Sequence, residues 1–324
     1  MLLVALLASS IAFAAPQAEI PAPEEFFGFP IGTDEKLARW DKILEYFDLL
    51  AGASDRVRVD EYGPTTLDNR FVSVVVTAPE NFADIDRYVD IGRQLADGRS
   101  LSQQQARALA QEGKVTVVLN HNIHSSEIGS SQTSVNLVYL LATGEDDVTQ
   151  EILDNVVTVL IPSANPDGQV LVTDWYRRNL DTEYERARMP WIYHHYAGHD
   201  NNRDGYMINQ IESRVVTRVD RYWEPQIIYN HHQTSPFPTR IWIPPFAEPI
   251  SPNVHPLMWR TVNLIGMAMA QALEERGQEG AYHYGCLLYT SDAADERLGV
   301  DLGGRSIIKK KRWGGGGGGG GGGG

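Results

Sequence analysis

The segment 115–130, VTVVLNHNIHSSEIGS, combines side chains that could bind a metal ion. His124 and Glu127 are three residues apart. A β-branched run precedes them, which predicts a buried strand over 115–119, and the apolar periodicity after them predicts a helix over 128–141. A strand end that leads into a helix is where open α/β sheets place ligand sites. Zinc accepts both imidazole and carboxylate ligands, although an isolated H-x-x-E pattern is short and also fits a polar loop with local hydrogen bonds.

The segment around His124 and Glu127 reads NIHSSE at 122–127, and four more polar motifs follow it in order along the chain. These are NPDG at 165–168, WYRRN at 175–179, DNNR at 200–203 and NHHQ at 230–233. Together the five motifs resemble the zinc metallocarboxypeptidases of the carboxypeptidase A type, over roughly residues 55–285.

The resemblance implies that His124, Glu127 and His232 bind zinc. Three protein ligands leave a fourth position open for water, as in catalytic zinc sites. His231 competes with His232, but neighbours on a strand point to opposite faces, so only one of them can ligate. The match favours the histidine before Gln233. The remaining histidines are expected to be ordinary polar residues: His121, His194, His195, His199, His255 and His283.

Further roles are implied by the same resemblance. Asp200 would accept a hydrogen bond from the first histidine ligand, although an aspartate there could instead cap a turn. Arg177 would stabilise the oxyanion, with Arg178 as the neighbour it could be confused with and a solvated basic pair as the alternative. Asn202 and Arg203 would grip the terminal carboxylate of a peptide, unless Arg203 is a structural tie within its loop.

One feature of this family cannot be placed in the sequence. Its general base is a glutamate on a strand after the third zinc ligand. Between His232 and residue 285, where the sequence changes in character, glutamates occur only in a Pro-rich loop and in or just after a predicted helix. They are Glu248, Glu274, Glu275 and Glu279. The capping tyrosine cannot be placed either. We therefore expect an inactive fragment of an active parent enzyme.

The predicted function is a zinc-dependent carboxypeptidase-like hydrolase that removes C-terminal residues from peptides. One alternative is an amidase or deacylase of the same fold, because a fold does not fix the substrate. A second alternative is a non-catalytic zinc-binding module.

The composition sets limits on the partners and on the location. A net charge of −14 and a pI of about 5.1 argue against nucleic acid as a partner. The apolar run over 1–15 ends in small residues, which indicates a signal peptide and a secreted or periplasmic protein, although Lys and Arg are absent from its start. No later stretch is long and apolar enough to predict a stable membrane anchor.

The last 39 residues differ in character from the rest. Residues 286–324 begin with CLLYTSDAADE and end in a run of glycines. The first string resembles a translated sequencing adapter, so we expect a non-native tail that holds the only cysteine, Cys286. The native domain is then expected over 20–285, truncated at its C-terminus.

Strands and helices alternate along this domain. Such alternation predicts an α/β fold with a mixed, mostly parallel central sheet and helices on both faces. Strands are expected at 56–62, 71–77, 115–119, 156–161, 226–229 and 241–243, and helices at 34–51, 81–96, 97–113, 128–141, 148–155, 207–223 and 254–275.

Overall fold

The structure is a computed structural model that describes residues 20–192, 196–233, 240–245 and 251–283. The chain forms two compact units, one that ends at His231 and one that begins at His232. The predicted leader and tail lie outside the described residues, as do His194, His195 and Glu248. The domain bounds inferred from the sequence stay predictions.

The first unit is built around a five-stranded sheet with the order β1-β2-β4-β3-β5. Strands β3, β4 and β5 are parallel, and β2 is antiparallel to its neighbours β1 and β4. The predicted mixed, mostly parallel sheet is therefore confirmed, with β2 alone running against the rest. The strands are β1 Val57–Pro64, β2 Arg70–Val76, β3 Val115–Asn120, β4 Val156–Ile161 and β5 Ile227–Asn230.

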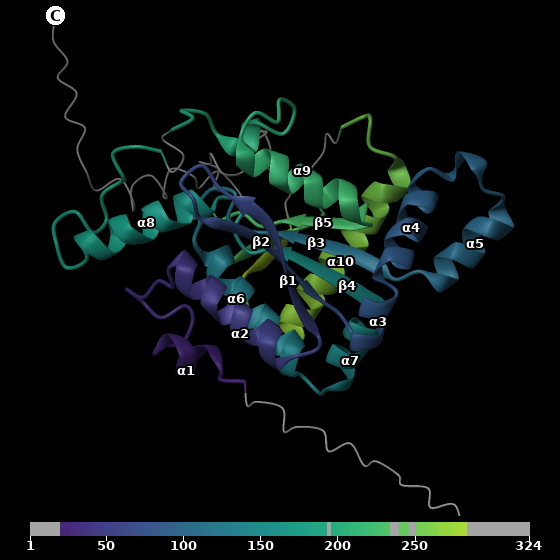
Figure 1. Cartoon of the computed structure of the whole chain (residues 1–324), viewed down its shortest axis with the longest axis horizontal. Coiled ribbons are helices and arrows are strands. Elements are labelled where there is room, and N and C mark those ends of the chain that lie inside the picture. Colours follow the sequence, from purple (N-terminus) through teal and green to yellow (C-terminus); the bar gives the residue numbers. More distant parts are fainter. Residues whose placement is uncertain (1–19, 193–195, 234–239, 246–250, 284–324) are drawn as a thin grey trace, which may run out of the picture. The chain divides into compact units, whose positions relative to one another are not determined.

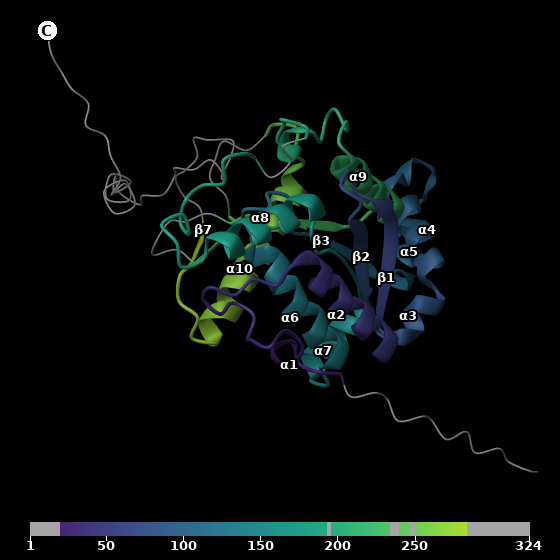
Figure 2. The same cartoon turned by 60° about the vertical axis from the view of Figure 1, so that its left-hand side comes forward.

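Helices cover both faces of this sheet (Figure 1). Successive residues of a strand point to opposite faces, so Val74 of β2 packs with α2 and α6 while Val75 packs with α4 and α9. Figure 2 shows α2 and α6 side by side on the sheet face that they cover. The α-helices of this unit are α1 Pro23–Phe27, α2 Trp40–Ala53, α3 Pro79–Ala83, α4 Ile85–Ala96, α5 Gln103–Glu112, α6 Gly129–Thr143, α7 Asp147–Asn155, α8 Pro166–Asn179 and α9 Ile211–Trp223, and the 3-10 helices are η1 Gly98–Ser100 and η2 Asn201–Arg203.

Helix α8 is the main element that the sequence patterns miss. Its first residues belong to the NPDG motif, which the sequence indicates only as a turn. In the structure the side chain of Asn165 accepts a hydrogen bond from the Gly168 N–H at 2.9 Å, and Pro166 takes the first helical position. Asn and Pro favour helix starts as well as turns, so the local pattern does not separate the two.

The second unit contains β6 Ile241–Ile243, β7 Ala281–His283 and α10 Pro256–Glu275. Strands β6 and β7 pair in parallel, and α10 packs against both. Gly266 allows the helix to approach Pro244 closely, because a Cβ at this position would lie 2.1 Å from the carbonyl oxygen of Pro244. The predicted strand at 241–243 and the predicted long helix are confirmed.

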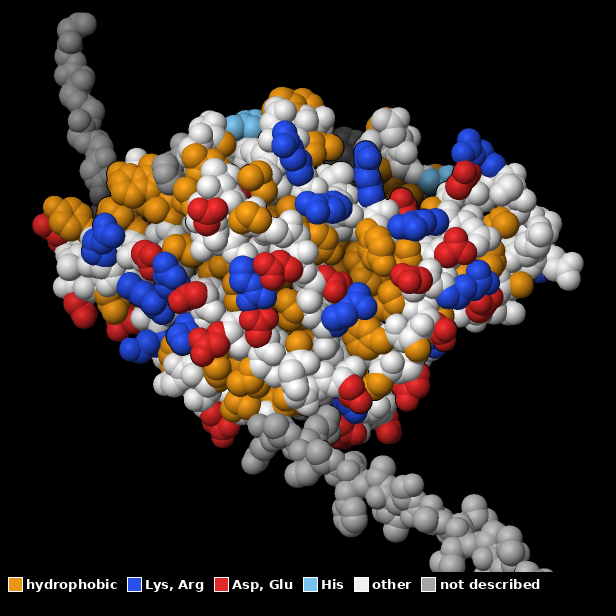
Figure 3. Space-filling model, viewed as in Figure 1, with side chains coloured by type: hydrophobic (Ala, Val, Ile, Leu, Met, Phe, Trp, Pro, Cys, Tyr) orange, Lys and Arg blue, Asp and Glu red, His pale blue; other side chains and the backbone are white. Residues whose placement is uncertain are grey.

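The surface mixes charges of both signs. On the face in Figure 3, basic and acidic side chains are interspersed and do not gather into a single patch. Several charged side chains of the described residues form ion pairs, such as Arg70 with Asp48 at 2.6 Å and Arg87 with Glu112 at 2.7 Å. Exposed pairs of this kind add little to stability. Among the described residues, no helix has both the length and the apolar composition needed to cross a bilayer.

Asp220 of α9 yields a prediction about stability. Its half-buried carboxylate has an Oδ1 with no hydrogen-bond partner among the described residues, and burial raises its pKa to about 6. The folded state therefore binds a proton more tightly than the unfolded chain. The protonated carboxyl of Asp220 therefore favours the folded state. Its contribution to the free energy of unfolding is complete below about pH 4 and is lost as the pH rises through about 6.

We expect Asp220→Asn to raise the free energy of unfolding at pH 7 by about 1 kcal/mol, since solvent screens part of the effect. Urea unfolding between pH 4 and 8 measures this change, with the exposed Asp55→Asn as the matched control. Equal pH profiles for Asp220→Asn and the unmutated chain would contradict the prediction.

Candidate metal centre

Three strand ends meet at one edge of the sheet. Asn120 at the end of β3 is in register with Ile161 of β4 and with Asn230 of β5. The backbone extends this pairing, because His121 N–H donates to the Ile161 carbonyl and His231 N–H donates to the Asn120 carbonyl. The segments that leave β3 and β5 therefore start side by side, although more than 100 residues separate them in sequence.

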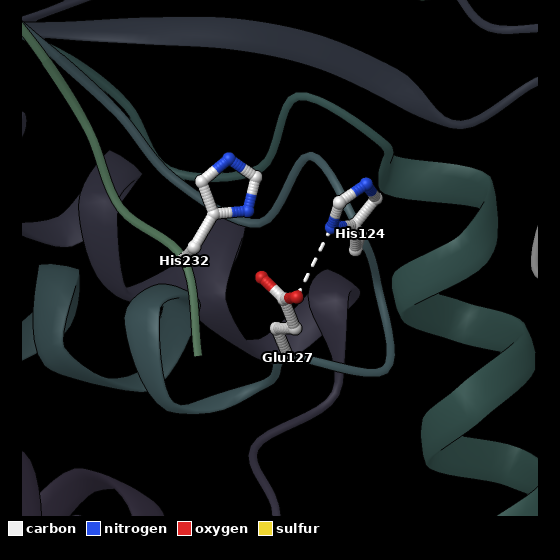
Figure 4. A group of neighbouring side chains, drawn as sticks. All are labelled: His124, Glu127 and His232. Carbon is white, nitrogen blue, oxygen red and sulfur yellow. Dashed lines mark hydrogen bonds and ion pairs between the residues drawn. The ribbon is translucent and has the colours of Figure 1, made fainter. Parts of the chain in front are cut away.

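Figure 4 shows the side chains of His124, Glu127 and His232 pointing toward one another. One ligand atom from each lies within 4.8 Å of the other two, and His124 Nδ1 is 3.0 Å from Glu127 Oε1. His124 and Glu127 are 4% and 8% exposed, so water reaches this pair poorly. Among the described residues, this is the one group of three such side chains that could hold a metal ion.

The donor set fits zinc. Tetrahedral zinc with bonds of about 2.0–2.1 Å places its ligand atoms roughly 3.4 Å apart, which is within the spread of the three side chains. Two imidazoles and one carboxylate also match the ligand types of catalytic zinc sites, which leave one position open. A buried carboxylate beside two imidazoles is stabilised by a cation, because burial without one disfavours its charged form.

Asp200 fixes the orientation of the His124 ring from the other side. Its Oδ1 lies 3.3 Å from His124 Nε2, and it also accepts a hydrogen bond from the Asn202 N–H at 2.8 Å. Burial opposes the charge on both residues. Their mutual contact nevertheless lowers the pKa of Asp200 to about 2, and the contacts with Asp200 and Glu127 raise the pKa of His124 to about 9. Nε2 therefore faces the Asp200 carboxylate, and Nδ1 faces the metal position.

The structure separates the two adjacent histidines. His232 supplies a ligand atom to the metal group, while the ring of His231 packs near His121, with 5.4 Å between the ring centroids. His121 is 3% exposed, and burial together with His231 lowers its pKa to about 3, so the ring is neutral at physiological pH. His232 is thus the histidine that the geometry favours, in line with the sequence motif.

The other predicted site residues are more exposed than His124 and Glu127. Arg177, at the end of α8, is exposed and donates from Nη2 to the Leu37 carbonyl at 2.7 Å. Arg203 is an exposed residue of η2, and Asn202 beside it is half-buried. Residue Asn201, next to this pair, donates to the Ile123 carbonyl at 2.7 Å, so η2 is attached to the turn that carries His124.

Several buried polar residues around this turn carry no separate signal in the sequence. They tie the turn to neighbouring segments through hydrogen bonds whose partners are up to 47 residues away. A local pattern cannot show such partners. These residues are Asn122, Ser125, Ser130, Ser163 and Gln169.

The model of the zinc carboxypeptidase family matches residues 43–237, which is more than half of the 324 residues, and the chain therefore belongs to this family. A zinc carboxypeptidase from Simulium vittatum is 26% identical over 137 residues, which make up 40% of this chain and 43% of that protein. The chain thus spans less than half of this curated relative.

Two solved structures share the fold. Carboxypeptidase A from Helicoverpa armigera has a TM-score of 0.51 and 15% identity, over 78% of this chain and 58% of that one. A carboxypeptidase-like protein from Burkholderia mallei has a TM-score of 0.51 and 14% identity, over 78% of this chain and 53% of that one.

The contact between His124 and Asp200 can be tested by Asp200→Asn. An amide is a weaker hydrogen-bond acceptor than a carboxylate and does not hold the ring in one tautomer, so we expect at least tenfold weaker zinc binding. Competition with a chromophoric chelator at pH 7 measures the affinity. The control is Asp174→Asn, which removes an ion pair with Arg39 elsewhere on the surface. Unchanged affinity in Asp200→Asn would contradict the assigned ring orientation.

Proposed function

We propose that this chain is the zinc-binding part of a secreted carboxypeptidase-like hydrolase that removes C-terminal residues from peptides. The observation that carries the proposal is the convergence of His124, Glu127 and His232 at the carboxyl edge of the sheet. The family match supports the reaction class, and the apolar run over 1–15 supports export.

The chain's own residues take distinct roles in this proposal. His124, Glu127 and His232 hold the metal, and Asp200 keeps the His124 ring in the tautomer that exposes Nδ1. Zinc, when bound, polarises a carbonyl and lowers the pKa of a coordinated water.

Arg203 and Asn202 bind the terminal carboxylate of the substrate. A guanidinium presents parallel N–H donors that match both oxygens of a carboxylate, so this contact would select chain ends. Arg203 is exposed and therefore accessible to a peptide. Arg177 is proposed to stabilise the oxyanion, which requires its guanidinium to leave the Leu37 carbonyl when substrate binds.

A general base is not proposed within the described residues. Beyond His232, the described glutamates are Glu274 and Glu275 at the end of α10 and Glu279 just after it, and none of them is on a strand. We expect the chain to bind zinc and peptides, and we propose no turnover by the described residues alone. A non-catalytic zinc module would bind zinc equally well but would show no preference for free chain ends.

The preference for free chain ends is the experiment that tests the function. Zinc-loaded chain should bind a short peptide with a free C-terminus about tenfold more tightly than the same peptide with a C-terminal amide, because one charge-assisted pair is lost. Isothermal titration measures both affinities. Arg203→Ala should remove the difference, while Arg99→Ala, at an exposed position of η1 beside Asp97, should retain it.

Equal affinity of the unmutated chain for the two peptides would overturn the carboxylate clamp and favour the amidase, deacylase or binding-module alternatives. Release of the terminal residue, detected by mass spectrometry, would instead show that a general base is present after all.

A further inference from the structure

The turn between β3 and α6 depends on one buried residue with an unusual backbone. Asn122 has a φ of 57°, in the left-handed region, and its relative exposure is 0%. Asparagine adopts this conformation more readily than most residues other than glycine. Asn122 lies two residues after the end of β3, and His124 follows two positions later.

The side-chain amide of Asn122 joins the turn to two other elements. Its Nδ2 donates to Ser163 Oγ after β4 at 3.0 Å and to Gln169 Oε1 of α8 at 2.7 Å. Both contacts are fully buried, so they are not exchanged for water. The amide therefore fixes the position of the turn relative to β4 and α8.

The backbone of Asn122 reaches the second metal ligand. Its N–H donates to Ser130 Oγ at 2.9 Å, and the Ser130 hydroxyl in turn donates to the Glu127 carbonyl at 3.3 Å. The Glu127 N–H closes the turn by donating to the His124 carbonyl at 2.9 Å. A shift at Asn122 is thus passed to both His124 and Glu127 through hydrogen bonds.

We propose that Asn122 is a positioning residue that holds His124 and Glu127 in metal-binding geometry before the metal arrives. The proposal rests on the metal site of the proposed function. Without the amide, the metal-free turn samples more conformations. Metal binding must then order the turn, and the loss of conformational entropy opposes binding. The effect should therefore appear as weaker metal affinity, beyond any loss of stability.

The first test is Asn122→Gly, which keeps the positive φ accessible and removes only the amide. We expect about tenfold weaker zinc binding in a competition with a chromophoric chelator, within the range found when groups that orient metal ligands are removed. Thermal unfolding of the same metal-free samples reports stability separately.

A matched pair of glutamines provides the second test. Gln169 accepts hydrogen bonds from Asn122 and Ser131 and donates to the Ala38 carbonyl at 3.4 Å. Gln132 of α6 is also buried and bonds to the backbone of Ala38 at 2.9 and 3.1 Å, but it has no hydrogen bond to Asn122. We expect Gln169→Leu to weaken zinc binding and Gln132→Leu to leave it within twofold, although both lose buried hydrogen bonds and stability. Asn122→Gly combined with Gln169→Leu should be little worse than either change alone.

The outcomes distinguish this inference from the function on which it rests. If the unmutated chain does not bind zinc, the metal site itself fails. If it binds zinc and both Asn122→Gly and Gln169→Leu bind equally well, the metal site stands and the positioning role is overturned. If Gln132→Leu weakens binding as much as Gln169→Leu, the effect reflects general stability and the positioning role is likewise overturned.

Discussion

The imidazole of His124 lies between two carboxylates, and the rest of the site depends on this arrangement. Glu127 is 3.0 Å from Nδ1, and Asp200 is 3.3 Å from Nε2. Glu127 is buried and requires a positive charge nearby, because an uncompensated buried carboxylate is strongly disfavoured, whereas the side chain of Asp200 is 37% exposed. The raised pKa of His124, to about 9, is one way to supply that charge. A metal ion at Nδ1 supplies it equally and leaves the Nε2 proton for Asp200.

The sheet makes this arrangement possible because its strand ends meet at one edge while its two faces remain apolar. Parallel pairing of β3 with β4 and β5 brings three carboxyl ends to one edge, and apolar side chains of α2, α4, α6 and α9 bury both faces. The polar residues of the metal-binding turn lie where the strands end. Hydrogen bonds from Asn122 to Ser163 and from Ser125 to Asn165 then hold the metal-binding turn against the segment that follows β4, and a hydrogen bond from Asn201 attaches η2 to the same turn.

Local patterns were sufficient for the elements that carry the ligands. The β-branched runs place β3, β4 and β5 to within one residue, and the alternation of strands and helices predicts the mixed sheet with two covered faces. Strand geometry allows only one of His231 and His232 to be a ligand, and the family resemblance favours His232. The structure places His232 beside His124 and Glu127.

Long-range contacts were not accessible from the sequence. The contact of Arg177 with the Leu37 carbonyl joins segments 140 residues apart, and no local pattern encodes it. Helix α8 was missed because Asn165 and Pro166 serve turns and helix starts alike. The role of Asn122 depends on partners after β4 and in α8 that only the fold assembles.

The central claim is that one zinc ion binds between His124, Glu127 and His232. X-ray absorption spectroscopy at the zinc edge tests it directly on chain loaded with one equivalent of zinc. The account predicts two imidazole nitrogens and light oxygen ligands at about 2.0–2.2 Å, with one imidazole lost in His232→Ala and none lost in His231→Ala. An unchanged spectrum in His232→Ala, or loss of an imidazole in His231→Ala, would contradict it.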